Sequence, residues 1–330
     1  MNKLAERQTT DKQSEANSEP WRPGSKVLWE RRKELELEKE YPPGGAWIDD
    51  GKDYNLIAVV KFFLRIFLTM TGLYKRGERN ADSPVLREMD FVFPHLPPEL
   101  DEFRILHISD LHFDDDRPEF PALLRDFLDP VRADIAVLTG DYRFTGHGDY
   151  GHVPQAMATF LEGVHAEHGV IGILGNHDNS AFVQPLVDLG VRMLVNDRIQ
   201  LEVNGGRMWI AGLDDHHRYG CDDMSGALAG VDPGDFVVLL THSPELIRQA
   251  ARMGVDLYLC GHTHGGQICL PGIGPVLLNA FGTPRKYCSG RWRHEGVQGY
   301  TTSGLGATAL HVRYNCPPEA GLITLRRGTD

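Results

Sequence analysis

Five short apolar runs of this sequence end in side chains that can bind a cation or transfer a proton. The runs are FRILHISDLH, ADIAVLTGDYR, GVIGILGNHD, DFVVLLTHS and VDLYLCGHTH, and their polar ends are Asp110, His112, Asp141, Asn176, His242, His262 and His264. One such residue at one strand end is commonly a helix cap, a turn or a hydrogen-bonded surface group. Turn chemistry gives no reason for histidine to recur four times there. We therefore expect the seven side chains to form one shared site.

The donor atoms of this set are carboxylate and amide oxygens and imidazole nitrogens, without a thiolate. Such donors suit Mn, Fe, Zn, Co or a similar ion and argue against a cysteine-type structural zinc site. Seven donors exceed the needs of one tetrahedral ion and suffice for two divalent ions about 3.5 to 4 Å apart that share a carboxylate. Two cations would neutralise the charge that a phosphoryl group spreads in its transition state, so the set predicts phosphoryl transfer.

Helix-like stretches alternate with the apolar runs and give the fold class. They cover residues 119–128, 153–164, 180–189 and 244–253. Strands that alternate with helices predict a layered α/β fold with largely buried strands. Ligands in such folds gather where the strands end, which is where the seven donors lie.

Length, charge and cysteine content narrow the function classes. The 330 residues suit one sizeable core with an appendage. A formal net charge of -12 argues against duplex nucleic acid as a partner. The five cysteines are scattered and odd in number, which favours a reducing, cytoplasmic compartment.

The N-terminal third has a different composition. Residues 1–55 form a polar extension in which WERRKELELEKE predicts an exposed helix or a disordered tail, and we expect no chemistry there. Residues 81–102 end in a proline-rich stretch and are expected to link the extension to a catalytic domain at 103–330.

An apolar run at residues 56–74, LIAVVKFFLRIFLTMTGLY, predicts an amphipathic helix within residues 56–80. Its length approaches that of a membrane span, but Lys61 and Arg65 lie one helical turn apart. A narrow basic stripe fits a helix that lies in the membrane surface, so we expect contact with the cytoplasmic side of a membrane, peripheral or anchored. The alternatives are a true span and a helix packed on a soluble cytoplasmic protein.

The motifs DLH, GDYR, GNHD, TH and GHTHGG, in this order and spacing, resemble those of the calcineurin-like metallophosphoesterases. The resemblance covers roughly residues 103–326, and the C-terminal stretch TSGLGATALHVRYNCPPEAGLITL is similar to the bacterial branch of membrane-associated phosphohydrolases. It implies a four-layer αββα sandwich with two divalent ions at the strand ends of a hydrolase, and the helical N-terminal extension interpreted from composition lies outside it.

The resemblance also implies roles for individual residues. One ion would be held by Asp110, His112, Asp141 and His264, and the other by Asn176, His242 and His262 with Asp141 as the bridge. A hydroxide between the ions would be the nucleophile. His177 would protonate the leaving oxygen or stabilise charge there, and Asp178 would hold the orientation of His177.

Two positions depart from particular branches of the family. Phe144 stands where a purple acid phosphatase would have tyrosine, which disfavours ferric-tyrosinate chemistry. His177 stands where some relatives that act on lipid A precursors have arginine, which weakens the inference of their substrate.

Other polar residues near the motifs are weaker candidates. Arg143 is equally consistent with a contact to substrate phosphate and with a salt bridge. The loops DDHHR at 214–218 and FDDDR at 113–117 are interpreted as solvated rather than as substrate contacts. Cys260 is interpreted as a core residue, and His107 as a core residue or a support for a ligand rather than a ligand itself.

These observations predict a binuclear phosphohydrolase that cleaves a phosphoester or pyrophosphate bond in a small-molecule or lipid-linked substrate. One alternative is a nuclease or cyclic-nucleotide phosphodiesterase on the same metal site. An alternative of another class is a membrane scaffold that binds metal without catalysis, and the absence of turnover on any activated phosphate ester would identify it.

Overall fold

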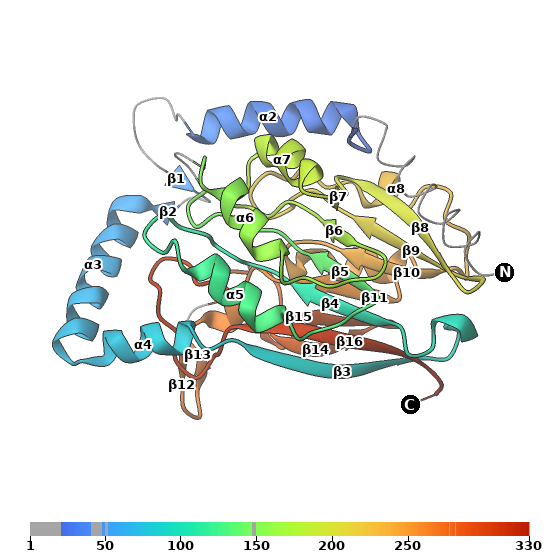
Figure 1. Ribbon diagram of the computed structural model, residues 1–330. Coiled ribbons are helices and arrows are strands. Elements are labelled where there is room, and N and C mark those ends of the chain that lie inside the picture. The colour runs from blue at the N-terminus through green and yellow to red at the C-terminus, as the bar shows by residue number, and fades with distance from the viewer. Residues whose placement is uncertain are drawn as a thin grey trace.

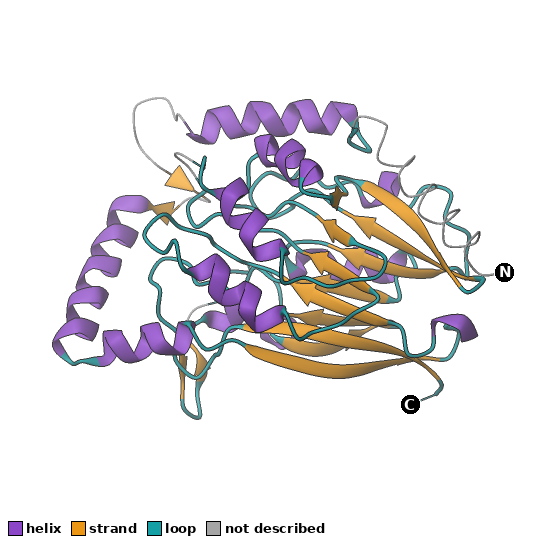
Figure 2. Ribbon diagram, in the orientation of Figure 1, coloured by secondary structure: helices purple, strands orange, loops and turns teal. Residues whose placement is uncertain are grey.

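Two sheets pack face to face at the centre of the protein, with helices on their outer faces (Figures 1 and 2). The structure is a computed structural model that describes residues 21–40, 48–49, 52–146, 150–276, 278–280 and 282–329. Each sheet has six strands. The layers run helix, sheet, sheet, helix, so the predicted αββα sandwich is confirmed.

The first sheet has the order β3-β16-β4-β5-β6-β7. Strands β4 to β7 are parallel, and β16 is antiparallel to β4 but parallel to β3. Their bounds are Val85–Phe93 for β3, Arg104–Ile108 for β4, Ile135–Leu138 for β5, Val170–Gly172 for β6, Val191–Met193 for β7 and Glu319–Arg327 for β16.

The second sheet has the order β14-β15-β11-β10-β9-β8, with parallel inner strands and an antiparallel strand at each edge. The bounds are Asp197–Val203 for β8, Gly206–Gly212 for β9, Phe236–Leu240 for β10, Leu257–Cys260 for β11, Gly290–His294 for β14 and Val297–Thr301 for β15. Two short hairpins lie outside both sheets, β1 (Ile48–Asp49) with β2 (Lys52–Asp53) and β12 (Cys269–Leu270) with β13 (Gly274–Pro275).

Alternate side chains of the inner strands enter different cores. Ile105 of β4 packs between the sheets, whereas its neighbour Leu106 packs under the outer helices. Both side chains are fully buried, which is why the strands read as continuous apolar runs. The carboxyl ends of the parallel strands consequently meet at one edge of the sandwich.

The predicted helical stretches are confirmed, with short 3-10 turns opening two of them. Helices α5 and α6 cover the first sheet together with α7, and α8 and α9 cover the second (Figure 1). The bounds are Phe120–Leu128 for α5, Val153–Leu161 for α6, Val183–Asp188 for α7 after the turn Ser180–Phe182, Met224–Ala227 for α8, and Ile247–Arg252 for α9 after the turn Pro244–Leu246.

The N-terminal extension contains helix α2, Lys26–Glu40, which lies across α7 along the top of the sandwich in Figure 1. Trp29 belongs to the core under α5 to α7, and the indole of Trp21 donates to the carbonyl of Met193 at 2.9 Å. The predicted helix is present, but it is not exposed on all sides, because Trp29, Arg32 and Glu36 are buried against the fold. The earlier part of the extension lies outside the described residues.

The segment at 81–102, predicted as a linker, contains an edge strand of the first sheet. Strand β3 pairs with β16 over its whole length, and its residues Phe91 and Phe93 are buried. The prolines that suggested a linker follow the strand at 94–98 and form the short turn Pro98–Leu100. The catalytic fold thus starts before residue 103.

Helix α3, Tyr54–Met70, and helix α4, Leu73–Ala81, lie at one side of the sandwich (Figure 1). Phe62, Phe63, Phe67 and Met70 of α3 are 60, 63, 58 and 83% exposed. Among the described residues, no helix has both the length and the apolar character needed to cross a bilayer.

Candidate metal centre

The structure brings all seven predicted ligands together at the carboxyl edge of the strands. They come from the ends of β4, β5, β10 and β11 and from the loop after β6. The most exposed of them, Asn176, is only 6% exposed. Their donor atoms form two groups that face a common interior.

The first group consists of Asp110, His112 and His264. The Nε2 atoms of the two histidines are 3.1 Å apart, and Nε2 of His264 is 3.5 Å from Oδ1 of Asp110. Three ligand atoms so close together, each from a different side chain, leave room for one ion among them.

The second group consists of Asn176, His242 and His262. The amide oxygen of Asn176 lies 2.9 Å from Nε2 of His242 and 2.8 Å from Nδ1 of His262. The two histidines therefore present different ring nitrogens to the same point.

Asp141 lies between the groups. Its Oδ2 atom is 3.5 Å from Nε2 of His112 and 3.3 Å from Nε2 of His242. One carboxylate oxygen thus faces both groups, which is the position that a bridging ligand requires.

Five of the seven candidate ligands have a left-handed backbone. Their φ angles are 53° at Asp110, 46° at His112, 58° at Asp141, 70° at His262 and 51° at His264. This conformation is uncommon for residues other than glycine and costs on the order of 1–3 kcal/mol at each position. The backbone turns sharply where each strand ends, and the turn directs the side chain into the site.

Glycine beside the ligands is required by close packing. A Cβ atom on Gly261 would lie 2.1 Å from Oδ2 of Asp110, and one on Gly175 would lie 2.2 Å from Oδ1 of Asp141. Glycine at these two positions thus lets the backbone lie directly against the carboxylates of two candidate ligands.

Electrostatics prepare the donors for a cation. Burial alone would raise the pKa values of Asp110 and Asp141, but the surrounding imidazoles hold both below the ordinary range. Burial lowers the pKa of His264 to about 3 and that of His262 well below its usual value, so both rings are neutral. Charged carboxylates and neutral imidazoles are the forms that bind a metal.

Hydrogen bonds to backbone carbonyls fix the rings of two further histidines. Nδ1 of His112 lies 3.0 Å from the carbonyl of Arg143, and Nδ1 of His242 lies 2.8 Å from that of Thr139. A carbonyl oxygen can only accept a hydrogen bond, so Nδ1 carries a proton and donates it, and Nε2 faces the site. Burial opposes the charge of His242, but Asp141 raises its pKa to about 10, so cation binding there must displace a proton.

His177 is adjacent to both Asp141 and His112. Its Nδ1–H donates to the carbonyl of Phe144 at 2.8 Å, and its ring centre is 4.8 Å from that of His112. Burial lowers the pKa of His177 to about 4. The ring is therefore neutral, and its Nε2 atom is a hydrogen-bond acceptor.

Asp178 does not contact the ring of His177, contrary to the sequence prediction. Its carboxylate accepts the backbone N–H groups of Asp141, Tyr142 and Gly175 at 2.7 to 2.8 Å. Burial raises its pKa to about 6. The carbonyl of Phe144 orients His177 instead, and Asp178 braces the strained turn that carries Asp141.

Arg143 is buried beside the site, close to two aromatic rings. Its Nε donates to the carbonyl of His177, and its guanidinium lies over the rings of Tyr150 and Phe182 at 5.7 and 5.6 Å. The contact to His177 makes it a support of that loop, which neither sequence interpretation included.

The loop at 214–218 was interpreted as solvated, but the structure buries most of it. Asp214 and Asp215 are buried, and the ring of His217 lies 4.2 Å from that of His262. Nδ1 of His217 lies 3.0 Å from Glu245. The sequence does contain a pattern that marks this loop. The apolar run MWIAGL, most of which forms β9, ends directly before it, just as the other five apolar runs end before their candidate ligands.

Asn279 was also missed. Its amide nitrogen is 3.5 Å from Nε2 of His262, on the side of that ring away from Asn176. No neighbouring motif marks it, since a loop brings it to the site from outside the strand ends.

Cys260 and His107 are core residues, as predicted. The thiol of Cys260 is fully buried 3.2 Å from the hydroxyl of Thr301, and burial raises its pKa. Nε2 of His107 lies 2.9 Å from the hydroxyl of Thr139, the residue whose carbonyl contacts His242.

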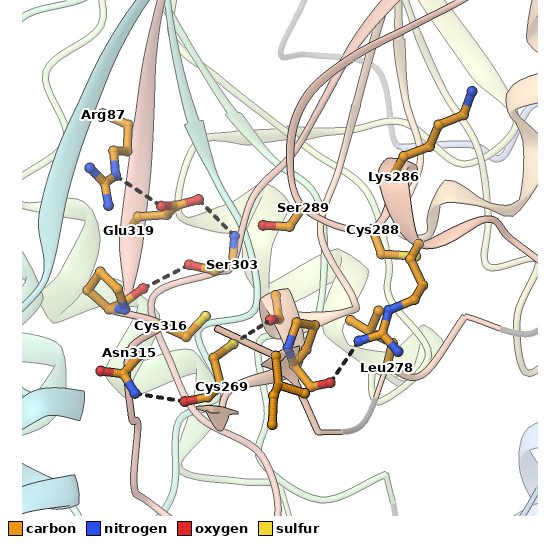
Figure 3. Close-up of a pocket in the computed structure, with 15 residues that line it drawn as sticks. Arg87, Cys269, Leu278, Lys286, Cys288, Ser289, Ser303, Asn315, Cys316 and Glu319 are labelled. Carbon is orange, nitrogen blue, oxygen red and sulfur yellow. Dashed lines mark hydrogen bonds and ion pairs between the residues drawn. The ribbon is translucent and has the colours of Figure 1, made fainter. Parts of the chain in front are cut away.

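A pocket of about 510 Å³ lies behind the turn that carries His264 (Figure 3). Its wall includes Gly265 and Cys316, and the thiol of Cys316 is 3.2 Å from the carbonyl of His264. Arg285 and Lys286 also line it, and neither pairs with a carboxylate of a described residue. The pocket therefore has an uncompensated positive side next to the candidate metal centre.

Comparisons with known proteins find a family model and similar sequences. The family model described as calcineurin-like phosphoesterase matches residues 103–266. The uncharacterized metallophosphoesterase YkuE of Bacillus subtilis is 30% identical over 239 residues, which cover 70% of this chain and 82% of that protein. A Bos taurus transmembrane protein with a metallophosphoesterase domain is 28% identical, covering 71% of this chain and 55% of its own.

Among solved structures, similarity is more distant. The calcineurin-like phosphoesterase YfkN of Bacillus subtilis is 13% identical with a TM-score of 0.36, covering 62% of this chain and 81% of that one. The NAD nucleotidase of Haemophilus influenzae is 16% identical with a TM-score of 0.41, covering 62% of this chain and 45% of that one.

Proposed function

Because this chain belongs to the calcineurin-like metallophosphoesterase family, and is thus a phosphoester hydrolase, we propose that it works with two divalent ions. The observation that best supports two ions is the position of Asp141, whose Oδ2 faces both groups of donors within 3.5 Å. Asp110, His112 and His264 would hold one ion, and Asn176, His242 and His262 the other. The donor set fits Mn, Fe, Zn or Co.

The bound ions would supply a hydroxide at neutral pH and neutralise charge on the phosphoryl oxygens. The protein supplies the orientation of the donors, through the hydrogen bonds at Nδ1 of His112 and His242 and the turn braced by Asp178. Because the site is buried among strand ends, these groups act in a water-poor environment in which their charges interact strongly.

We propose that His177 transfers the proton to the leaving oxygen. In the free protein its ring is neutral, with a pKa of about 4. A bound phosphate carries negative charge, which favours the imidazolium and raises that pKa again. Phe144 holds the ring with Nε2 as the atom that takes up and returns the proton.

The substrate is proposed to be lipid-linked, with α3 in contact with a membrane surface. The support is the exposed apolar side of α3, since contiguous exposed apolar side chains commonly mark an interaction surface. Arg65 on the same helix and Lys75, Arg76 and Arg79 on the next provide the cations that anionic headgroups attract.

The pocket beside His264 is proposed to receive an anionic part of the substrate that is not cleaved. Arg285 and Lys286 provide positive charge with a carbonyl and an aromatic ring as neighbours, and Ser289, Ser303 and Asn315 provide hydroxyl and amide groups (Figure 3). A second phosphate of a pyrophosphate-containing substrate has the matching charge.

The test of the proposed function is hydrolysis of bis-p-nitrophenyl phosphate and of the monoester by metal-free protein reloaded with Mn, Fe, Zn or Co. We expect turnover with at least one ion and two ions bound per chain. Inactivity with all four ions on both esters would contradict it.

Replacement of His177 tests its separate role. His177→Asn should lower kcat by about 10²- to 10⁴-fold, the usual contribution of a positioned acid or base, while metal content stays at two per chain. His165→Asn, at a half-exposed histidine paired with Asp129, is the control and should change neither quantity. Loss of an ion from His177→Asn would make this residue a ligand instead.

A further inference from the structure

Helix α2 carries an arginine with an unusual environment. Arg32 has no solvent exposure, although a buried charge costs several kcal/mol unless its surroundings compensate for it. Its guanidinium bonds to Asp214 and to Glu36, and it lies 3.6 Å from the ring centre of Tyr219. Burial disfavours its charge, but Asp214 and the neighbouring acids raise its pKa, so it stays protonated.

The second terminal nitrogen of Arg32 reaches the loop of the metal centre. It donates to the carbonyl of Asp178 at 2.9 Å and lies 3.4 Å from that of Gly175. These two carbonyls flank Asn176 and His177 in the chain. The guanidinium of Arg32 thus contacts both ends of the turn that carries Asn176 and His177.

Glu36, one turn further along α2, holds the end of the same loop. Its carboxylate accepts the backbone N–H of Ser180 at 2.7 Å and the hydroxyl of Ser180 at 2.6 Å, while it also pairs with Arg32. Helix α2 thus contacts the loop at three positions within six residues.

Arg32 also joins a second loop of the site. Its partner Asp214 begins the loop that places His217 4.2 Å from His262. The loop that carries Asn176 and the loop that carries His217, which lies against His262, consequently meet at one guanidinium.

We propose that Arg32 and Glu36 are positioning residues of the catalytic centre, which set the places of Asn176 and His177 through the loop at 175–180. The inference rests on the proposed two-metal function. Helix α2 lies far before the family motifs in the sequence, yet under this proposal it supports the second metal site. Partners that orient metal ligands typically change metal affinity by 10- to 100-fold when removed.

The test uses three substitutions in the full chain. Arg32→Lys keeps the charge but removes the fork that reaches both Asp214 and the loop carbonyls. Ser180→Ala removes the hydroxyl contact of Glu36 without burying an unpaired charge. Arg31→Met changes the neighbouring arginine of the same helix, which is 52% exposed, and is the control.

The measurements are manganese binding to metal-free protein by equilibrium dialysis, thermal unfolding, and kcat and KM on bis-p-nitrophenyl phosphate. For Arg32→Lys we expect one of the two manganese affinities to fall by about tenfold or more while the other stays unchanged, with kcat lowered more than KM is raised. Ser180→Ala should shift the same quantities less, and Arg31→Met should match the wild type.

Folded Arg32→Lys and Ser180→Ala proteins with wild-type manganese affinities and kcat would overturn the proposal, even if their unfolding temperatures were lower. The binding measurement needs no turnover. An inactive wild type that binds two ions would therefore count against the proposed function and leave the role of α2 testable.

Discussion

Helices α2 and α3 are close in the sequence and opposite in their surroundings. Helix α2 is rich in charge, yet Arg32 and Glu36 are buried against a loop of the metal centre. Helix α3 is rich in large apolar residues, yet Phe62, Phe63 and Phe67 are more than half exposed. The composition of a helix therefore did not determine its burial, because the neighbours of each helix lie far away in the sequence.

The difference separates two kinds of contribution. The buried charges of α2 are costly by themselves and are retained in a specific network, which ties them to the geometry of one loop. The exposed side chains of α3 contribute little to folding, so the contact that could cover them is expected to be external. Substitutions of the buried charges of α2 should change stability and metal binding, and substitutions of the exposed apolar residues of α3 should change only association.

The largest change in the free energy of unfolding is expected for Arg32→Met. The change leaves Asp214 buried without its cation, and breaking a buried pair in this way costs about 3–5 kcal/mol. Urea unfolding of the metal-free protein measures it. A loss below about 1 kcal/mol would mean that α2 is as dispensable for folding as α3.

A somewhat smaller change in the free energy of unfolding is expected when Asp214 titrates. Burial raises its pKa from 3.8 to about 6, so the folded state holds this proton more tightly than the unfolded state. The contribution of this group to stability is complete below pH 3.8 and is lost as the pH rises through 6, by about 3 kcal/mol in all.

In Asp214→Asn that titration is absent. Urea unfolding of both metal-free proteins at pH 4, 5, 6 and 7 should show the wild type losing stability relative to the variant as the pH rises. Parallel curves would show that Asp214 does not titrate in this range.

The exposed apolar residues of α3 should affect binding to vesicles and no other property. Phe62→Asp and Phe67→Asp should each weaken sedimentation with phosphatidylglycerol vesicles by about tenfold or more, since a phenylalanine inserted in the interface contributes roughly 1.5–3 kcal/mol. Stability and turnover of bis-p-nitrophenyl phosphate should not change. The control is Leu37→Asp, which alters a residue of α2 that is 64% exposed. Equal binding by all these proteins would remove the proposed membrane contact.

Much of the fold and of the ligand set could be predicted from the sequence, for a physical reason. Buried parallel strands appear as apolar runs, and their ends are adjacent in space, so polar residues after each run mark the site. From this pattern alone, Asp110, Asn176 and His242 could be predicted to lie at one edge of the sheets.

The supporting contacts could not be predicted in that way. Arg32 and Asp214 are 182 positions apart, and nothing local in either segment indicates their pairing. Asp178 is adjacent to His177 in the sequence, but the left-handed turn at Asp141 presents backbone N–H groups that its carboxylate accepts instead. Strand β3 was missed because the prolines after it dominated the interpretation of the segment.

The place of β16 has a consequence for how the protein is made. This last strand lies between β3 and β4, which are among the first parts of the catalytic fold to be synthesised. The first sheet therefore stays split, with β3 detached, until residues 319–327 have been synthesised. Contacts between such distant segments form slowly and leave strand edges open meanwhile. A ribosome-bound chain that ends before residue 319 should accordingly lack a closed first sheet, and deletions within residues 319–327 should be more harmful to production of the enzyme than their distance from the metal centre suggests.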